Sequence, residues 1–336
     1  MKRNFRILGI AVIVVLTTGG VAFSLPSLLA LALESEQDTF PATLEQFPVT
    51  VDPRNKVIVE DPRVNALLES QHSPLQAAVG NIQNILRVAF EWTALSIAET
   101  PWYQSIAAAD GRLVAIAPGM RKEQAASAFA KALAWSKKQK QTFMTAPADA
   151  FLPLPEGSFS PGIYTVTADA TPSEAQALVN DRFSKDVLAH YGTTTAEVVP
   201  LDQALTIASL IEREAGGPDD MRIISGIIWN RLFTNMNLQI DATLQYAKAN
   251  NSDVGNWWPK VQPADRYRRS LYNTYLHSGL PPAPIANPSV AAILAALNPK
   301  NTSCLFYFHD AARQFHCSDT YAGHVALLKK YYGRGR

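Results

Sequence analysis

The 336-residue sequence has little net charge and none of the common short catalytic motifs. Thirty Lys and Arg residues against 29 Asp and Glu residues leave a formal charge of +1, so the chain has no overall basic field that could hold a polyanion. It contains no G-x-S-x-G, H-E-x-x-H, G-x-G-x-x-G, Walker A or paired C-x-x-C sequence, and its six histidines are scattered without ligand spacing. We therefore expect no nucleic-acid partner, no metal site and no cofactor.

Apolar residues are abundant: the chain is 47% hydrophobic and 18% charged, which is typical of a globular protein. No charged side chain occurs from Ile7 to Leu33, and a membrane-spanning helix needs roughly 20 apolar residues. Basic residues precede this run and acidic residues follow it, which places residues 1–6 in the cytoplasm. We predict a single-pass anchor in the inner membrane over residues 7–33, with the remainder on the periplasmic side. A cleaved signal peptide ending near Ala30-Leu31-Ala32 is the alternative, and it also exports the chain.

Export bears on the only two cysteines, Cys304 and Cys317. Two cysteines are too few for a disulfide framework, although an oxidising compartment permits a single bridge. Two unpaired, small core residues fit the sequence equally well. The sequence leaves both alternatives open.

Two segments of different patterning follow the apolar run. Residues 34–107 begin as a proline-broken polar tether, with a short strand expected at Lys56–Val59, and continue into a helix from Ser73 to about Leu95. Residues 108–200 contain two passages in which a β-type run leads into a helix, the second helix covering Pro172–Leu188. We predict a small α+β module for residues 108–200.

Residues 201–336 are predicted to form a second α+β unit. Two helical segments meet at a stop signal, Gly216-Gly217-Pro218, and a long polar and aromatic loop region is expected from Asn235 to Tyr275. A short helix at Val290–Leu297 and a β-type run beginning at Leu305 follow. The predicted fold class of the whole chain is therefore α+β.

The stretch IASLIEREAGG, residues 207–217, places two glutamates in the last turn of an apolar helix. At 3.6 residues per turn, Glu214 lies on the apolar face between Ile207 and Leu210, and Glu212 is rotated from it by roughly 160°. A carboxyl held against apolar side chains loses solvation in its charged form, so its pKa rises and it can act as a general acid. The alternative is that both glutamates reach water at the end of the helix.

Amides and aromatic rings surround this stretch in the sequence. Asn230-Arg231, Gln239, Asp241 and Asn273-Thr274-Tyr275 supply polar groups. The aromatic residues of the intervening loops are Trp257, Trp258, Tyr267 and Tyr272. Such a mixture suits a sugar ring, whose C–H face stacks while its hydroxyls accept and donate hydrogen bonds, but loop aromatics that simply cover the core fit as well.

Six strings carry a resemblance to a known family: ASLIEREAG, IIWNRL, MNLQIDATLQYA, YNTYLHSGLPPAPIANPSVAAILAALNP, LFYF and TYAGH. Their order and spacing resemble those of the endolytic murein transglycosylases of the YceG-like family, from Leu201 to about His324. The resemblance implies a LysM-like module within residues 108–200 and a catalytic domain at residues 201–336. It also implies cleavage of the MurNAc-β-1,4-GlcNAc bond of peptidoglycan glycan strands without water, leaving 1,6-anhydroMurNAc ends.

By matching position, the resemblance implies that Glu214 is the catalytic acid and then base. It implies that the remaining site residues orient Glu214, bind the sugars or hold the loops; these are Glu212, Asn230, Gln239, Asp241, Tyr246, Asn273 and Tyr275. Peptidoglycan synthases or division and elongation proteins are the protein partners it suggests. Two alternatives stay open: a muramidase-type hydrolase using Glu214 and Asp241, and a non-catalytic glycan-binding scaffold of the cell-wall machinery.

Overall fold

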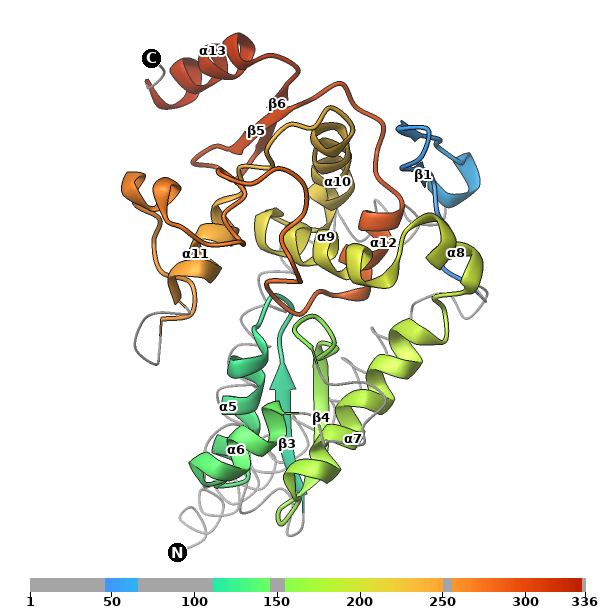
Figure 1. Cartoon of the computed structure of the whole chain (residues 1–336), viewed down its shortest axis with the longest axis vertical. Coiled ribbons are helices and arrows are strands. Elements are labelled where there is room, and N and C mark those ends of the chain that lie inside the picture. The colour runs from blue at the N-terminus through green and yellow to red at the C-terminus, as the bar shows by residue number, and fades with distance from the viewer. Residues whose placement is uncertain (1–45, 66–110, 146–154, 250–255, 334–336) are drawn as a thin grey trace, which may run out of the picture.

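The structure is a computed structural model that describes residues 46–65, 111–145, 155–249 and 256–333. Figure 1 shows a smaller part built on strands β3 and β4 and a larger, mostly helical part around α9. The predicted membrane span over residues 7–33 and the predicted helix from Ser73 to about Leu95 lie outside the described residues. Within the described ranges, no helix is long and apolar enough to cross a membrane.

The smaller part contains an antiparallel strand pair covered by helices. Strand β3 (Gly111–Ile116) pairs with β4 (Gly162–Thr167) along its full length. Helix α5 (Lys122–Ala132) packs against β3, and α6 (Lys137–Met144) packs against α5. Ala125, Phe129 and Leu133 recur at helical spacing along α5 and its end, and all three side chains are buried.

Helix α7 joins the two parts. It covers Pro172–Phe183 and continues into one π-helical turn, η1, at Ser184–Leu188, so the helix predicted over Pro172–Leu188 is confirmed. The helix begins at Pro172 because the side chain of Thr171 accepts from the backbone of Glu174 and the Glu174 carboxylate accepts from Thr171 in return. Val179 is buried in the core of the smaller part and Val187 in that of the larger part, so the helix enters both.

The larger part is organised around α9 (Leu201–Glu214), after the short helix α8 (Thr193–Val198). Every residue from 204 to 211 is buried, because α10 (Pro218–Phe233) and α12 (Val290–Leu297) both pack against α9. The helix predicted at Val290–Leu297 has these bounds in the structure. The short hairpin β1 (Val51–Asp52) and β2 (Val57–Ile58) confirms the predicted strand near Lys56–Val59, and the backbone N–H of Thr50 just before it bonds the Leu297 carbonyl at 3.0 Å.

The prediction of a long loop region from Asn235 to Tyr275 is wrong in part, because two helical segments lie within it. Helix α11 occupies Asp241–Ala249, and a 3₁₀ turn, η2, occupies Pro263–Tyr267. The α11 helix forms because Asp241 brings a negative charge to its first turn and its apolar residues, such as Leu244 and Ala247, pack inward. At nine residues it is short enough for the surrounding polar sequence to hide its periodicity.

The chain ends in a hairpin followed by a helix. The predicted β-type run at Leu305 corresponds to β5 (Phe306–His309), which pairs antiparallel with β6 (Phe315–Ser318). Strand β6 and the last helix, α13 (Tyr321–Tyr332), were not predicted from the sequence pattern. In Figure 1 this hairpin lies at the end of the larger part opposite to β3 and β4.

Candidate active site

Glu214 is the last residue of α9 and points into the protein. The helix ends there because Ala215 is extended, with φ −68° and ψ 136°, and the Gly216-Gly217 stop follows. Burial raises the pKa of Glu214 above its ordinary value of 4.5. Its carboxyl is therefore biased toward the protonated form. The predicted position of Glu214 on the inward side of the helix agrees with its contact to Tyr307.

Three groups around Glu214 favour its ionised form and one opposes it. The Tyr307 hydroxyl on β5 donates to Glu214 Oε2 at 2.8 Å. The backbone N–H of Ala242, in the first turn of α11, also bonds the carboxylate, and the Arg231 charge attracts it; each of these contacts lowers the pKa of Glu214. The neighbouring Asp241 charge raises that pKa, in the same direction as burial. Burial thus favours the protonated carboxyl, while donors are in place for the carboxylate that forms when it loses its proton.

Asp241 and Tyr275 form the exposed side of the same cluster. The Tyr275 hydroxyl donates to Asp241 Oδ1 at 2.6 Å. The backbones around them are tied together, because the N–H of Gln239 bonds the Thr274 carbonyl at 3.0 Å. Gln239 itself is exposed and has φ 49°, a left-handed conformation that is uncommon for a residue other than glycine. The turn before α11 therefore holds Gln239 and Asp241 at the surface beside Tyr275.

The sequence did not single out Tyr307 or give Arg231 a role. Tyr307 is 93 residues from Glu214 along the chain, and nothing in the pattern of a four-residue strand marks which of its faces meets α9. Arg231 is buried in α10; its Nε donates to the Leu305 carbonyl at 2.7 Å, and its guanidinium lies 6.0 Å from the centre of the Tyr307 ring. Arg231 thus contributes charge to the site and fixes the chain that leads into β5.

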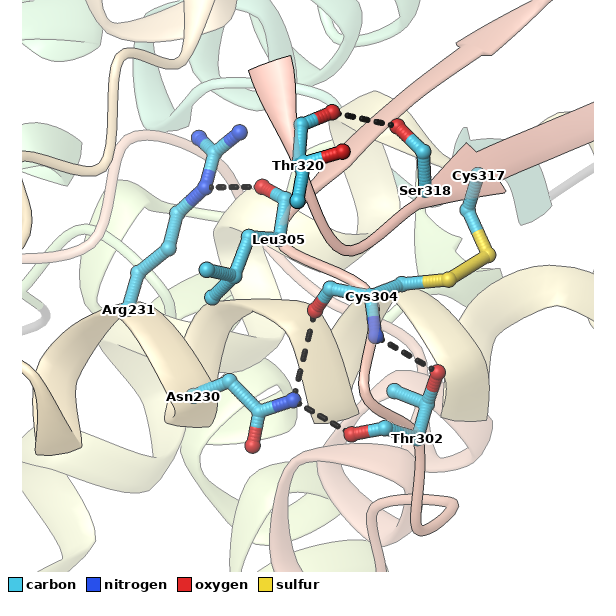
Figure 2. The surroundings of a disulfide bond; sticks show 8 residues. All are labelled: Asn230, Arg231, Thr302, Cys304, Leu305, Cys317, Ser318 and Thr320. Atoms are coloured by element: carbon cyan, nitrogen blue, oxygen red, sulfur yellow. Dashed lines mark hydrogen bonds between the residues drawn. A yellow bond between two sulfur atoms is a disulfide. The ribbon is translucent and has the colours of Figure 1, made fainter. Parts of the chain in front are cut away.

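The cysteines that the sequence left open form a disulfide, Cys304–Cys317. Figure 2 shows the bridge between β6 and the segment that precedes β5, next to Asn230 and Arg231. Cys317 lies directly opposite Tyr307 in the β5–β6 register. The bridge therefore ties the segment before β5 to β6 at the position opposite Tyr307, the residue that contacts Glu214.

A second contact from β5 reaches the turn after Glu214. His309 Nε2 lies 2.5 Å from Asp220 Oδ2, and the Asp220 carboxylate also accepts from the backbone N–H groups of Gly216 and Gly217. A Cβ at Gly216 would lie 3.0 Å from the His309 ring, so a larger residue there would have to push the ring aside. Strand β5 thus holds α9 at Glu214 and again just beyond it.

Three other predicted site residues hold backbone or a helix end. Glu212 Oε2 accepts from the Ser289 N–H at 3.0 Å and from its hydroxyl at 2.6 Å, at the start of α12. Asn230 Nδ2 donates to the carbonyls of Thr302 and Cys304. Asn273 is fully buried and bonds the backbone before and after it, accepting from the Tyr275 N–H at 2.9 Å and donating to the carbonyls of Arg266, in η2, and Arg268, just after it. These contacts hold the start of α12, the segment before β5 and the loop around η2.

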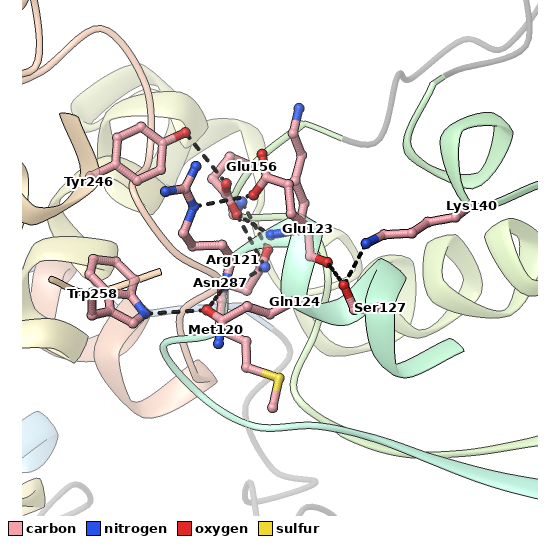
Figure 3. A network of polar contacts seen from close by, with 12 residues as sticks. Met120, Arg121, Glu123, Gln124, Ser127, Lys140, Glu156, Tyr246, Trp258 and Asn287 are labelled. Carbon is pink, nitrogen blue, oxygen red and sulfur yellow. Dashed lines mark hydrogen bonds and ion pairs between the residues drawn. The ribbon is translucent and has the colours of Figure 1, made fainter. Parts of the chain in front are cut away.

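Tyr246 is part of a polar network between the two parts of the molecule (Figure 3). The guanidinium of the fully buried Arg121 lies 4.2 Å from the centre of the Tyr246 ring. Glu156 is buried beside them and accepts from the Lys122 N–H at 2.7 Å, and burial raises the pKa of Glu156 to about 8. Asn287 connects the parts further, since its Oδ1 accepts from the N–H groups of residues 157 and 159.

The loop aromatics divide between packing and exposure. Trp258 faces inward: its indole N–H bonds Gln124 Oε1 at 3.3 Å, and the Arg213 guanidinium lies 3.9 Å from its ring centre. Tyr272 packs against Tyr246, with ring centres 4.7 Å apart. Tyr267, by contrast, is 80% exposed. Of these loop aromatics, Tyr267 has a ring face available to a ligand.

Across the described ranges, no group of three or more His, Cys, Asp and Glu side chains could hold a metal ion. The cluster formed by Glu214, Asp241, Tyr275, Tyr307 and Arg231 instead offers one carboxyl whose pKa is raised by burial, one exposed carboxyl, two phenols and a buried cation. Such a set can donate a proton to, and accept a proton from, a molecule bound between the Glu214 carboxyl and the protein surface.

Comparison with known proteins gives consistent matches. Residues 91–330 match the model of the YceG-like family. A protein of Bacillus subtilis named endolytic murein transglycosylase is 35% identical over 133 residues, which are 40% of this chain and 35% of that protein. One of Streptococcus pneumoniae with the same name is 28% identical over 158 residues, 46% of this chain and 28% of that protein. The matches therefore span about a third or less of these relatives.

A solved structure is also similar. The crystal structure of a YceG-like protein from Listeria monocytogenes superposes with a TM-score of 0.56 and 25% sequence identity, covering 64% of this chain and 75% of that one. The structural similarity thus covers a larger share of the chain than either sequence match.

Proposed function

The chain belongs to the YceG-like family, and from that premise we propose that it is an endolytic lytic transglycosylase acting on peptidoglycan glycan strands. The observation that carries the proposal is the position of Glu214: burial raises the pKa of its carboxyl, which Tyr307 and the Ala242 N–H contact. The names of the relatives from Bacillus subtilis and Streptococcus pneumoniae support the substrate class.

In the proposed reaction, one carboxyl serves both proton transfers. Glu214 donates its proton to the oxygen of the MurNAc-β-1,4-GlcNAc bond as the bond from that oxygen to the anomeric carbon of MurNAc breaks. The C6 hydroxyl of the same MurNAc then bonds to that carbon, and the Glu214 carboxylate takes the hydroxyl proton. The products are a free GlcNAc 4-hydroxyl and a 1,6-anhydroMurNAc end, and no water is consumed.

The neighbours of Glu214 have separable tasks in this scheme. Tyr307, Arg231 and the Ala242 N–H stabilise the carboxylate that exists between the two proton transfers. The Asp241 charge raises the pKa of Glu214 and lies where it can offset positive charge on the sugar as the bond breaks. Tyr275 fixes Asp241 through their 2.6 Å hydrogen bond. Gln239, exposed next to Asp241, is the amide we assign to sugar hydroxyls.

The same geometry supports a second candidate, a hydrolase in which Asp241 directs water or attacks the sugar, because two carboxylates near one bond suffice for hydrolysis. Digestion of purified glycan strands separates the two reactions by mass. Anhydro ends, lighter than reducing ends by one water, are the expected product. Reducing ends alone would favour the hydrolase, and binding without any cleavage would favour a scaffold.

We also propose that residues 7–33 anchor the chain in the inner membrane, with residues 108–200 as a LysM-like module and residues 201–336 as the catalytic domain outside. The Cys304–Cys317 disulfide supports an outward location, because disulfides persist in oxidising compartments. Peptidoglycan synthases or division and elongation proteins are the partners proposed for it. Protease added to intact spheroplasts should remove the catalytic domain while leaving a membrane-bound fragment, and protection of the domain would refute the orientation.

A further inference from the structure

The loop at and after η2 has a built backbone. Asn273 Nδ2 donates to the carbonyl of Arg266 at 3.0 Å and to that of Arg268 at 2.8 Å, and Asn273 is fully buried. Asp265, also buried, accepts from the Gln262 N–H at 2.7 Å and pairs with Lys248 at 2.8 Å. These contacts fix the course of the backbone, so the side chains that leave it are presented in set positions.

Three of those side chains, Arg266, Tyr267 and Leu271, are exposed. Tyr267 is 80% exposed and Leu271 is 70% exposed. Arg268 pairs with Asp265 at 3.5 Å, whereas Arg266 is exposed and pairs with no carboxylate in the described residues. The loop thus presents an exposed cation, Arg266, and at the next position in the chain an open aromatic ring, Tyr267. These are the two kinds of group that recognise a carboxylate and a sugar or peptide face.

The loop adjoins the proposed catalytic cluster. The Arg266 guanidinium lies 5.2 Å from the centre of the Tyr275 ring, and Tyr275 donates to Asp241 at 2.6 Å. Asn273 connects the two again, since its side chain bonds both the Arg266 carbonyl and the Tyr275 N–H. Arg266 is therefore linked through the Tyr275 ring to Asp241, which lies near the scissile bond in the proposed reaction.

We infer that Arg266, with Tyr267 beside it, is a specificity-determining pair that binds a carboxylate of the acidic stem peptide carried by the glycan strand. The inference rests on the proposed function. Stem peptides bear free carboxylates and leave the strand at MurNAc, the sugar on which the reaction takes place. A cation at the edge of the site therefore meets the peptide of a sugar bound at or next to Glu214. The guanidinium binds the carboxylate in a fork, and the Tyr267 ring packs on the peptide or sugar face.

The test compares three glycan substrates: strands with native stem peptides, strands whose peptide carboxylates have been converted to amides, and strands stripped of peptides by an amidase. The readout is the ratio of kcat/KM between substrates, measured as anhydro ends released. The full chain should prefer native strands by about three- to tenfold, as expected of a partly exposed charge pair. Arg266→Gln should bring the ratio close to one while still cleaving stripped strands, and Arg266→Lys should keep part of the preference.

Matched controls and salt define the outcome further. Lys137→Gln removes an exposed cation from α6, in the other part of the molecule, and should leave the ratio unchanged. Added salt should reduce the preference of the native chain, because the pair is exposed to solvent. An unchanged ratio in Arg266→Gln, or equal rates on native and amidated strands, would overturn the inference. A loss of binding to anionic lipid vesicles in Arg266→Gln, with the ratio unchanged, would overturn it in favour of a membrane contact. If the native chain released no anhydro ends from any strand, the proposed function would fail first.

Discussion

Tyr307→Phe tests whether the phenol on β5 stabilises the Glu214 carboxylate. The substitution removes one hydroxyl, which donates to Glu214 Oε2 at 2.8 Å, and keeps the ring that fills the site. A hydrogen bond to a charged group contributes about 1.5–3 kcal/mol. Since one pKa unit corresponds to about 1.36 kcal/mol, the pKa of Glu214 should rise by a further one to two units.

The sign of this shift gives a distinctive pH profile. Glu214 must be protonated to act as the acid, so activity is lost as pH rises through its pKa. In Tyr307→Phe this alkaline limb should move to higher pH, while the maximal rate of anhydro-end release falls by about tenfold because the carboxylate intermediate loses a donor. A purely structural loss would lower the rate and leave the limb in place.

Tyr332→Phe is the matched control. It also removes a phenol hydroxyl that contacts β5, where Tyr332 donates to the His309 carbonyl at 2.5 Å, but it leaves Glu214 untouched. Its pH profile should coincide with that of the native chain. Tyr307→Phe with a rate within twofold of native and an unmoved alkaline limb would refute the reasoning.

Three further predictions concern residues that hold the site or the junction between the two parts of the molecule. Replacing Cys304 and Cys317 by serine opens a bridge across 13 residues and should lower the free energy of unfolding by about 3 kcal/mol, measured in urea, and reduce cleavage; unchanged values would contradict it. Glu156→Gln should become more stable relative to the native chain as pH rises from about 4.5 to 8, because the native fold must keep Glu156 protonated while the unfolded chain ionises it; a flat difference would contradict this. Glu212→Ala should lower the free energy of unfolding by about 1–3 kcal/mol, because the Ser289 N–H and hydroxyl lose their acceptor. A smaller change would show that the contact between Glu212 and Ser289 does not stabilise the fold.

Local patterns predicted the elements that carry the site. The stripe of α9 and its Gly216-Gly217 stop placed Glu214 on the buried face, because period and helix end are written in adjacent residues. The start of α7 was equally local, since Thr171 and Glu174 cap each other within four residues. For such features the interactions that decide the structure lie within one or two turns.

Features set by distant contacts could not be predicted in this way. Tyr307 meets Glu214 across 93 residues, and Glu212 meets Ser289 across 77, so neither wheel geometry nor spacing could find them. The helical wheel shows only that Glu212 points away from Glu214. It does not show that Ser289, at the start of α12, bonds Glu212. Tyr246 was grouped with the site by resemblance, yet its environment is the Arg121 and Glu156 network between the two parts.

The most direct test of the central claim is the mass of the products released from purified glycan strands by the native chain and by Glu214→Gln. The glutamine keeps the shape of the side chain but cannot supply a proton. We predict anhydro ends from the native chain and a rate lower by about 10²–10⁴-fold from Glu214→Gln, the usual contribution of a general acid–base group. Release of anhydro ends by Glu214→Gln at the native rate would contradict the account.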